Sequence, residues 1–328
     1  MSYTGQNKAE LFAENAQIIK KDFVWQHALT KRLAALLYAQ EGRTIDCDAI
    51  RQCHSLIKQN TGAFSTFRGN MALCVAALLS LSRDPREVFG ETLKVYDLLK
   101  GEKLRASDYL VVAACLIAAR SGASDYSSVA ARTRVFYDGM RARHFFITSQ
   151  DDYIFAAMLG LTDLDPAAGS ERIERLFGRL KGEFWDRNSV QALAQVLVLG
   201  GSDDGIIDRV LALRDTLRAR KIRLDKTYTL PVMGVLAMLP VETDRIARDI
   251  AAIQDTLRAQ KGFGVLSVPT QELLLYAASI AASEYAKNVK DGVLTAALST
   301  SVTNIIIAQQ AAMIAAVSAS TAASSASS

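Results

Sequence analysis

The sequence predicts an all-α protein, a two-layer α-solenoid of about six to seven helical hairpins with a period of about 40 residues. Two patterns predict it: an amphipathic helix end recurs along the chain at that interval, and an uncharged segment stands between successive copies. The composition agrees, because half of the 328 residues are hydrophobic and only five are proline, so long helices and a large core are possible.

The recurring element is clearest at residues 253–260. Each copy carries an apolar anchor, and the anchors are Leu99, Met140, Leu180, Leu217 and Leu257, at intervals of 37 to 41 residues. Apolar residues precede each anchor at steps of three or four, which is one face of a helix. We expect the anchors in the core. Acid–base pairs such as Asp255 with Arg258 are expected on the exposed surface.

The segments between these amphipathic helices form the predicted inner layer. None of them contains Asp, Glu, Lys or Arg. A helix that is apolar on all sides must be buried on several sides, and these are shorter than the roughly 20 residues that cross a bilayer. The segments are 71–81, 109–119, 153–162, 190–199, 230–239 and 273–282.

The two ends of the chain differ from the middle. Residues 8–23 predict an amphipathic helix that serves as an end cap, followed by a first hairpin from 25–40 and 46–58. Residues 1–291 are expected to form a single helical repeat domain. No charged residue follows Asp291, so 292–317 is expected to be an Ala/Ile-rich helix and 318–328 a low-complexity disordered tail.

The C-terminal helix bears on partners. The window 298–316 contains too many Ser, Thr, Asn and Gln residues for a membrane span, so membrane association is not expected. The apolar face of the helix, which carries Leu294, Leu298, Val302, Ile305 and Ile306, is expected to pack on the last hairpin or on a second copy of the chain, which makes a homo-oligomer possible.

Charge and cysteine usage exclude several classes. The formal net charge is only +4 and acids alternate with bases, so no specific nucleic-acid partner is expected. The cysteines, Cys47, Cys53, Cys74 and Cys115, lack a CxxC spacing, and the N-terminus lacks the apolar core of a signal peptide. We therefore expect buried, reduced thiols and a cytoplasmic protein. No cofactor is predicted, and no metal site, because Cys47, Cys53 and His54 do not have zinc spacing.

The candidate binding site lies in the connections that follow an amphipathic helix and precede an uncharged one. Stacking of hairpins places all of these connections on one edge. They carry aromatic and basic side chains, which could bind an acidic ligand. In the alternative interpretation the bases complement helix ends and the rings fill gaps between repeats. The candidate residues are Phe64, Phe67, Arg68, Phe146, Trp185, Arg187, Arg223, Lys261 and Phe263.

With the repeats laid out, the chain resembles an uncharacterised bacterial family known as domain of unknown function 4003. The residues that carry the resemblance are 60–70 (NTGAFSTFRGN), 149–157 (SQDDYIFAA), 260–264 (QKGFG) and 306–313 (IIAQQAAM). It covers nearly the whole chain and implies no activity, ligand or catalytic residue.

Two function hypotheses follow. The leading one is a non-enzymatic scaffold, an open right-handed superhelix that binds an acidic peptide, a protein or a small anionic ligand along the predicted edge. The alternative is an enzyme built as a closed α/α toroid, in which carboxylates at inner-helix ends, such as Asp108, Asp152 and Asp186, act in a central cavity. Nothing in the sequence identifies a catalytic triad, and no serine has a nucleophile-elbow context.

Overall fold

The computed structural model describes residues 2–287, 307–309 and 311. In this part of the chain every regular element is helical: fourteen α-helices and one short 3₁₀-helix, η1, at Thr66–Arg68. No strand occurs among the described residues. The predicted all-α class is therefore confirmed.

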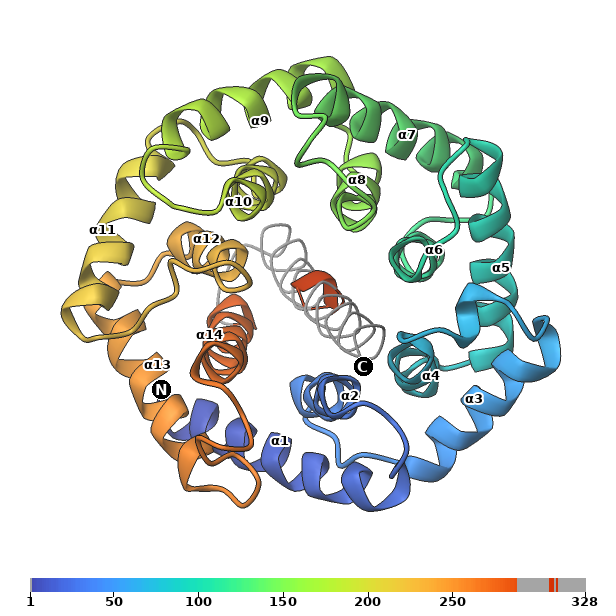
Figure 1. The fold of residues 1–328 in the computed structure, drawn as a ribbon, viewed down its shortest axis with the longest axis horizontal. Coiled ribbons are helices and arrows are strands. Elements are labelled where there is room, and N and C mark those ends of the chain that lie inside the picture. The colour runs from blue at the N-terminus through green and yellow to red at the C-terminus, as the bar shows by residue number, and fades with distance from the viewer. Residues whose placement is uncertain (1, 288–306, 310, 312–328) are drawn as a thin grey trace, which may run out of the picture.

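The helices alternate between an outer and an inner layer (Figure 1). The outer helices are α1 (Ser2–Asp22), α3 (Cys47–Asn60), α5 (Pro85–Gly101), α7 (Tyr126–Arg143), α9 (Pro166–Leu180), α11 (Ile206–Ala219) and α13 (Thr243–Ala259). The inner helices are α2 (Ala28–Gln40), α4 (Ala72–Leu81), α6 (Asp108–Ala118), α8 (Asp152–Gly160), α10 (Arg187–Leu199), α12 (Leu230–Met238) and α14 (Thr270–Lys287).

The first and last hairpins lie side by side. Helix α1 contacts both α13 and α14, and α14 also contacts α2, so the helices of Figure 1 follow one another around a ring. The first helix, predicted to be an end cap, packs on the last hairpin as well as on α2. Phe12 is fully buried, and its ring lies 5.2 Å from that of Phe263 and 4.9 Å from that of Tyr276.

Charged side chains join the two ends of the chain at this seam. The Arg32 guanidinium of α2 donates to both carboxylate oxygens of Glu272 in α14, at 2.6 and 3.2 Å. The Tyr276 hydroxyl donates to the same carboxylate at 2.6 Å. Lys8 of α1 pairs with Glu284 of α14. The seam is thus held by ion pairs between residues more than 200 positions apart, and Glu272 is only 2% exposed.

The predicted anchors all lie in the core. Leu99, Met140, Leu180, Leu217 and Leu257 are each at most 2% exposed, which confirms the apolar stripe. The expected surface pair of Asp255 with Arg258 is wrong. Arg258 instead donates to the carbonyls of Phe263 and Val268, both at 2.8 Å, because the connection after α13 has backbone acceptors that no helix satisfies.

Arginines of outer helices hold the ends of inner helices in a way that the sequence analysis did not predict. Arg132 of α7 donates to the carbonyls of Gly160, Thr162 and Leu164 where α8 ends. Arg209 of α11 makes the same kind of contact with three carbonyls at the end of α12. The last carbonyls of a helix lack partners within it, so a guanidinium stabilises them there.

Four described residues near the C-terminus occupy the centre of the ring (Figure 1). Ile307, Ala308 and Ala311 are 2–3% exposed and Gln309 is 7% exposed. The predicted contact face from Leu294 to Ile306 and the boundaries of 292–317 and 318–328 lie outside the described residues. In the part that is described, no helix is long and apolar enough to cross a membrane.

Candidate binding face

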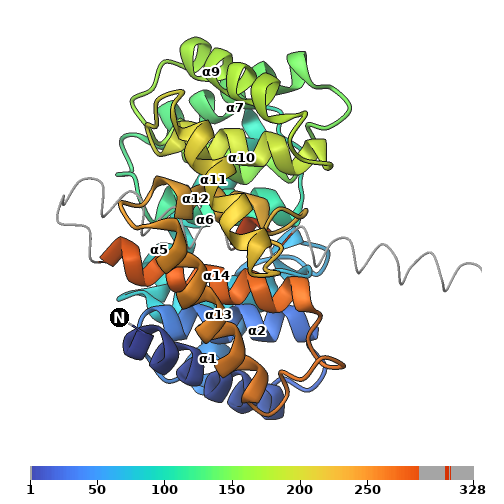
Figure 2. The same cartoon turned by 90° about the vertical axis from the view of Figure 1, so that its left-hand side faces the viewer.

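Every outer helix leads into an inner helix on the same side of the ring, because the two layers run in opposite directions across its thickness (Figure 2). The seven connections on that side define what we call the outer-to-inner face; the six return connections define the inner-to-outer face. The first set is 23–27, 61–71, 102–107, 144–151, 181–186, 220–229 and 260–269. The second set is 41–46, 82–84, 119–125, 161–165, 200–205 and 239–242.

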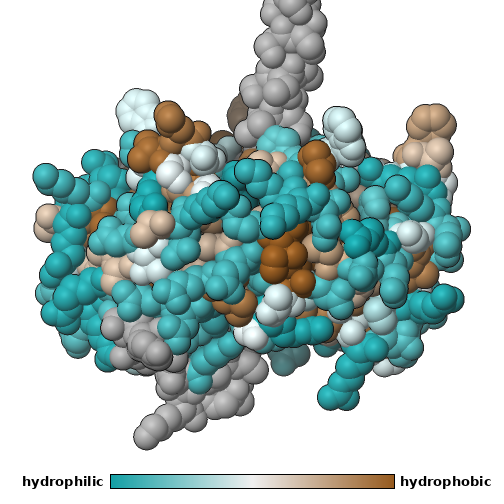
Figure 3. All heavy atoms as spheres, turned by 90° about the horizontal axis from the view of Figure 1, so that it is seen from below, coloured by the Kyte–Doolittle hydropathy of each residue, from teal (hydrophilic) through white to brown (hydrophobic). Residues whose placement is uncertain are grey.

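Large apolar side chains project from the outer-to-inner face. Of the nine large hydrophobic side chains that are more than half exposed in the described chain, eight belong to this face; the ninth is Val135, on α7. Figure 3 shows apolar groups standing out along the upper edge of the molecule. The exposed fraction is at least 98% for Trp25, Phe64, Phe146, Trp185 and Leu266. The other three are Val24, Phe145 and Val265.

The candidate rings divide into two groups. Phe64, Phe146 and Trp185 are exposed on the outer-to-inner face, as the site prediction requires. Phe67 and Phe263 are only 2% and 1% exposed, so their inclusion in the site is corrected. Phe67 packs edge-on against the rings of Phe89 and Tyr96. The rings of Phe67 and Phe263 fill the space beneath the connections and are core residues.

The candidate bases divide in the same way. Arg68 donates to the carbonyls of Lys58 and Thr61, at the end of α3. It is therefore a helix-end contact, as the alternative interpretation held, and not a free base. Arg187 and Lys261 are exposed and remain candidates.

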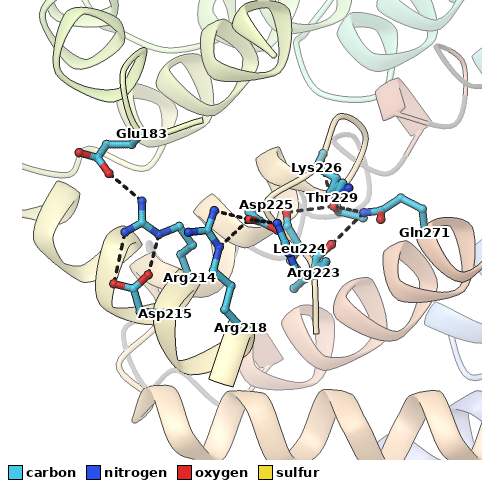
Figure 4. Close-up of polar contacts among 10 residues, drawn as sticks. All are labelled: Glu183, Arg214, Asp215, Arg218, Arg223, Leu224, Asp225, Lys226, Thr229 and Gln271. Carbon is cyan, nitrogen blue, oxygen red and sulfur yellow. Dashed lines mark hydrogen bonds and ion pairs between the residues drawn. The ribbon is translucent and has the colours of Figure 1, made fainter. Parts of the chain in front are cut away.

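Arg223 belongs to an ion-pair network in the connection between α11 and α12 (Figure 4). Its guanidinium donates to Asp225 at 2.9 and 3.2 Å, and Arg218 binds the same carboxylate. Gln271 donates to the Arg223 carbonyl at 3.0 Å. Burial alone would raise the pKa of Asp225, but hydrogen bonds from the two guanidinium groups hold it below its ordinary value. The Arg223 charge is thus largely used to fix this connection.

The two faces carry opposite charge. The outer-to-inner connections hold nine Lys and Arg against five Asp and Glu, a formal charge of +4. The inner-to-outer connections hold three against nine, a formal charge of −6. Helix dipoles do not require this difference, since each face contains C-terminal ends of one layer and N-terminal ends of the other. The apolar side chains and the basic excess therefore share one face.

Sequence reasoning missed several residues of the face. Trp25, Phe145, Val265 and Leu266 are more than half exposed but were not among the candidates. Their position in the same class of connection was the signal that could have found them. It could not say which of several neighbouring apolar residues points outward, because a connection without regular structure has no periodicity.

The carboxylates of the enzyme hypothesis do not converge. Asp186 caps α10, accepting hydrogen bonds from the backbone N–H of Asn188 and the Ser189 hydroxyl. Asp108 borders a cavity of about 320 Å³ next to Ala311. Asp152 borders a different cavity, of about 30 Å³, against Gln309. A volume near 30 Å³ holds about one water molecule, so the Asp152 cavity has no room for an organic substrate.

Asp152 is the centre of a buried polar cluster. It is 3% exposed and accepts hydrogen bonds from the side-chain amides of Gln191 and Gln195, at 2.9 and 2.8 Å, and from the Ser149 N–H at 3.0 Å. Burial, followed by repulsion from Asp151, raises the pKa of Asp152 to about 7, against the opposing effect of those hydrogen bonds. The cluster ties α8 to α10.

We expect Asp152 to make stability fall as the pH rises. The unfolded carboxyl releases its proton near pH 4 and the folded one near pH 7, so raising the pH between these values favours unfolding, by on the order of 4 kcal/mol in total. Asp152→Asn removes the titrating group. The stability of the variant at high pH is reduced in part, because the new side-chain amide nitrogen faces the Ser149 N–H and cannot accept its hydrogen bond. The stability difference between variant and wild type, measured by urea unfolding, should therefore shift in favour of the variant from pH 4 to pH 8.

The matched control is Asp208→Asn, which neutralises an exposed carboxylate in the first turn of α11. Its stability difference should vary far less over the same range. A constant difference for Asp152→Asn would contradict the raised pKa.

Cys47, Cys53, Cys74 and Cys115 are buried and unpaired with one another, and burial raises the pKa of each thiol. In the described chain no group of three or more His, Cys, Asp or Glu side chains gathers in a way that could hold a metal ion.

Fold and site together define an all-helical protein of paired helices, one face of which is apolar and basic. The profile of the family "Protein of unknown function (DUF4003)" matches residues 15–311, and the chain belongs to this family. It is 25% identical over 312 residues to "Uncharacterized protein YeaA" of Bacillus subtilis (strain 168), an alignment that covers 91% of this chain and 90% of that relative. No solved structure matches the chain.

Proposed function

We propose that the chain is a non-enzymatic scaffold, a closed α/α toroid of helical hairpins that docks through its outer-to-inner face onto an acidic partner surface. The observation that carries the proposal is that, among the described residues, eight of nine large apolar side chains that are more than half exposed share this one face with a net positive charge. Exposed apolar groups that gather on one side of a protein mark an interaction site. A cytoplasmic location, as expected from the sequence, is part of the proposal.

The toroid assignment rests on the seam. Contacts of α1 with α13 and α14, together with the buried pair of Arg32 and Glu272, link the first hairpin to the last. The enzyme hypothesis loses support at the ring centre, which a toroid enzyme needs for its substrate. Residues 307–309 and 311 occupy that centre, and Asp108 and Asp152 border separate cavities.

Site-specific photo-crosslinking in living cells tests the proposal. A photoreactive amino acid placed at Trp185 or Phe146 should form adducts, because both side chains lie on the proposed interface. The matched control is Val135, which is 53% exposed on the outer surface of α7 and should give none. Adducts are detected by mass spectrometry of the purified protein, so that protein and lipid adducts are both seen. Equal labelling at Val135 and Trp185, or none at Trp185 and Phe146, would remove the proposed function.

A further inference from the structure

The shape of the outer-to-inner face says what kind of partner fits it. Five of its seven connections each present an exposed Trp, Phe, Leu or Val, and they are spaced around the ring (Figure 1). The rings of Trp25 and Trp185 belong to connections on different hairpins and are 98% and 99% exposed. Each of these connections therefore presents its own small apolar group of one or two exposed side chains.

A protein partner selects a different arrangement. The residues that dominate protein interfaces cluster near the centre of one contiguous patch and fill pockets of the partner. Separate apolar side chains around a rim would need a matching set of distant pockets. A bilayer surface accepts each of them independently, because Trp, Phe and Leu side chains insert at the boundary between headgroups and acyl chains wherever they meet it.

The charges are arranged to suit a negative surface. The two connections without a strongly exposed apolar side chain, 102–107 and 220–229, contain six of the nine bases of the face. Two of the six, Arg220 and Arg223, pair with Asp244 and Asp225. The other four, Lys103, Arg105, Lys221 and Lys226, are exposed. Bases near the surface of an anionic leaflet attract a protein to it, and the acidic inner-to-outer face is repelled by the same surface. The polarity of the ring thus orients it with its apolar side chains toward the lipid.

We infer that the outer-to-inner face docks peripherally on an anionic lipid bilayer, with Trp25, Phe64, Phe146, Trp185 and Leu266 inserted between headgroups and exposed bases such as Lys221 and Lys226 on lipid phosphates. This inference rests on the proposed function and names its partner. It needs no membrane-spanning segment, because each apolar side chain enters from a connection and the helices stay outside.

The protein carries its own reporter for this contact. It contains two tryptophans, Trp25 and Trp185, and both belong to the face. All tryptophan emission therefore comes from the proposed lipid contact. Vesicles of equal parts phosphatidylglycerol and phosphatidylcholine should shift the emission of the full-length protein to shorter wavelength. Lipids brominated in the acyl chains should quench it. Phosphatidylcholine vesicles alone should have much less effect, and added salt should weaken the electrostatic attraction.

Matched variants locate the contact. Trp25→Ser with Trp185→Ser removes two exposed rings and no packing, and should lower binding in a vesicle sedimentation assay by about tenfold or more. Val135→Ser, on the outer surface of α7, should leave binding unchanged. Lys226→Glu, on the outer-to-inner face, should weaken binding. Arg83→Glu makes the same change of charge on the inner-to-outer face and should have less effect.

Two results would overturn the inference: no binding of the wild type to anionic vesicles, or equal binding of wild type and the double tryptophan variant. If the wild type does not bind anionic vesicles but photo-crosslinks at Trp185 trap a protein, the face docks on a protein. The proposed function then stands and the bilayer inference falls. If the wild type does not bind vesicles and no crosslinks form at Trp185 and Phe146, the inference and the proposed function fall together.

Discussion

Replacing Leu217 or Leu257 with alanine is expected to lower the free energy of unfolding by about 2–5 kcal/mol, the range for truncation of a buried leucine. Both side chains are at most 1% exposed and lie on the buried faces of α11 and α13. The cost comes from the lost transfer of apolar atoms out of water and from the cavity that remains. Urea or guanidinium unfolding, followed by circular dichroism, measures it.

The control for Leu257→Ala should be an exposed residue of the same helix whose side chain does not hold another segment in place. Arg258 does not qualify, since it donates to the carbonyls of Phe263 and Val268. Arg248 is exposed on α13, and Arg248→Ala should stay within about 0.5 kcal/mol of the wild type. Similar losses for Leu257→Ala and Arg248→Ala would refute the assignment of the anchors to the core.

Glu272→Ala is expected to cost about 3–5 kcal/mol, because it leaves the Arg32 guanidinium buried without its counter-charge. The side chains of Arg32 and Glu272 are 16% and 3% exposed, and the Tyr276 hydroxyl loses its acceptor as well. The helices next to the ion pair should lose stability before the rest of the ring does. Hydrogen exchange should rise in α2 and α14, which meet at the seam, more than in α8 on another part of the ring.

Two comparisons make this prediction specific. Asp48→Ala removes one partner of the exposed pair Arg51–Asp48 and should cost less than about 1 kcal/mol. Replacing both seam partners, Arg32→Met with Glu272→Leu, removes the stranded charge and should cost less than Glu272→Ala alone. If Glu272→Ala were as mild as Asp48→Ala, the ion pair would not hold the seam.

The candidate site could be predicted only in part. Its location was accessible, because the alternation of amphipathic and uncharged helices places Phe64, Phe146 and Trp185 in one class of connection. The sequence did not indicate which side chains of these connections point outward. Phe64 is fully exposed and Phe67, three residues later, is buried, although both stand in the same glycine-containing connection. Gly69 shows how tight the packing there is, since a Cβ at that position would lie 2.4 Å from Asp108 Oδ1.

By itself the sequence determined the helical class and the assignment of segments to two layers, because both follow from periodicity within a single helix. It also contained a sign of the seam: α2 and α14 are the inner helices with charged residues beyond their first position. Only the tertiary structure decided that these two helices meet. The reason is that the curvature of stacked hairpins accumulates over the whole chain, and small changes at each contact decide whether Arg32 reaches Glu272, 240 residues away.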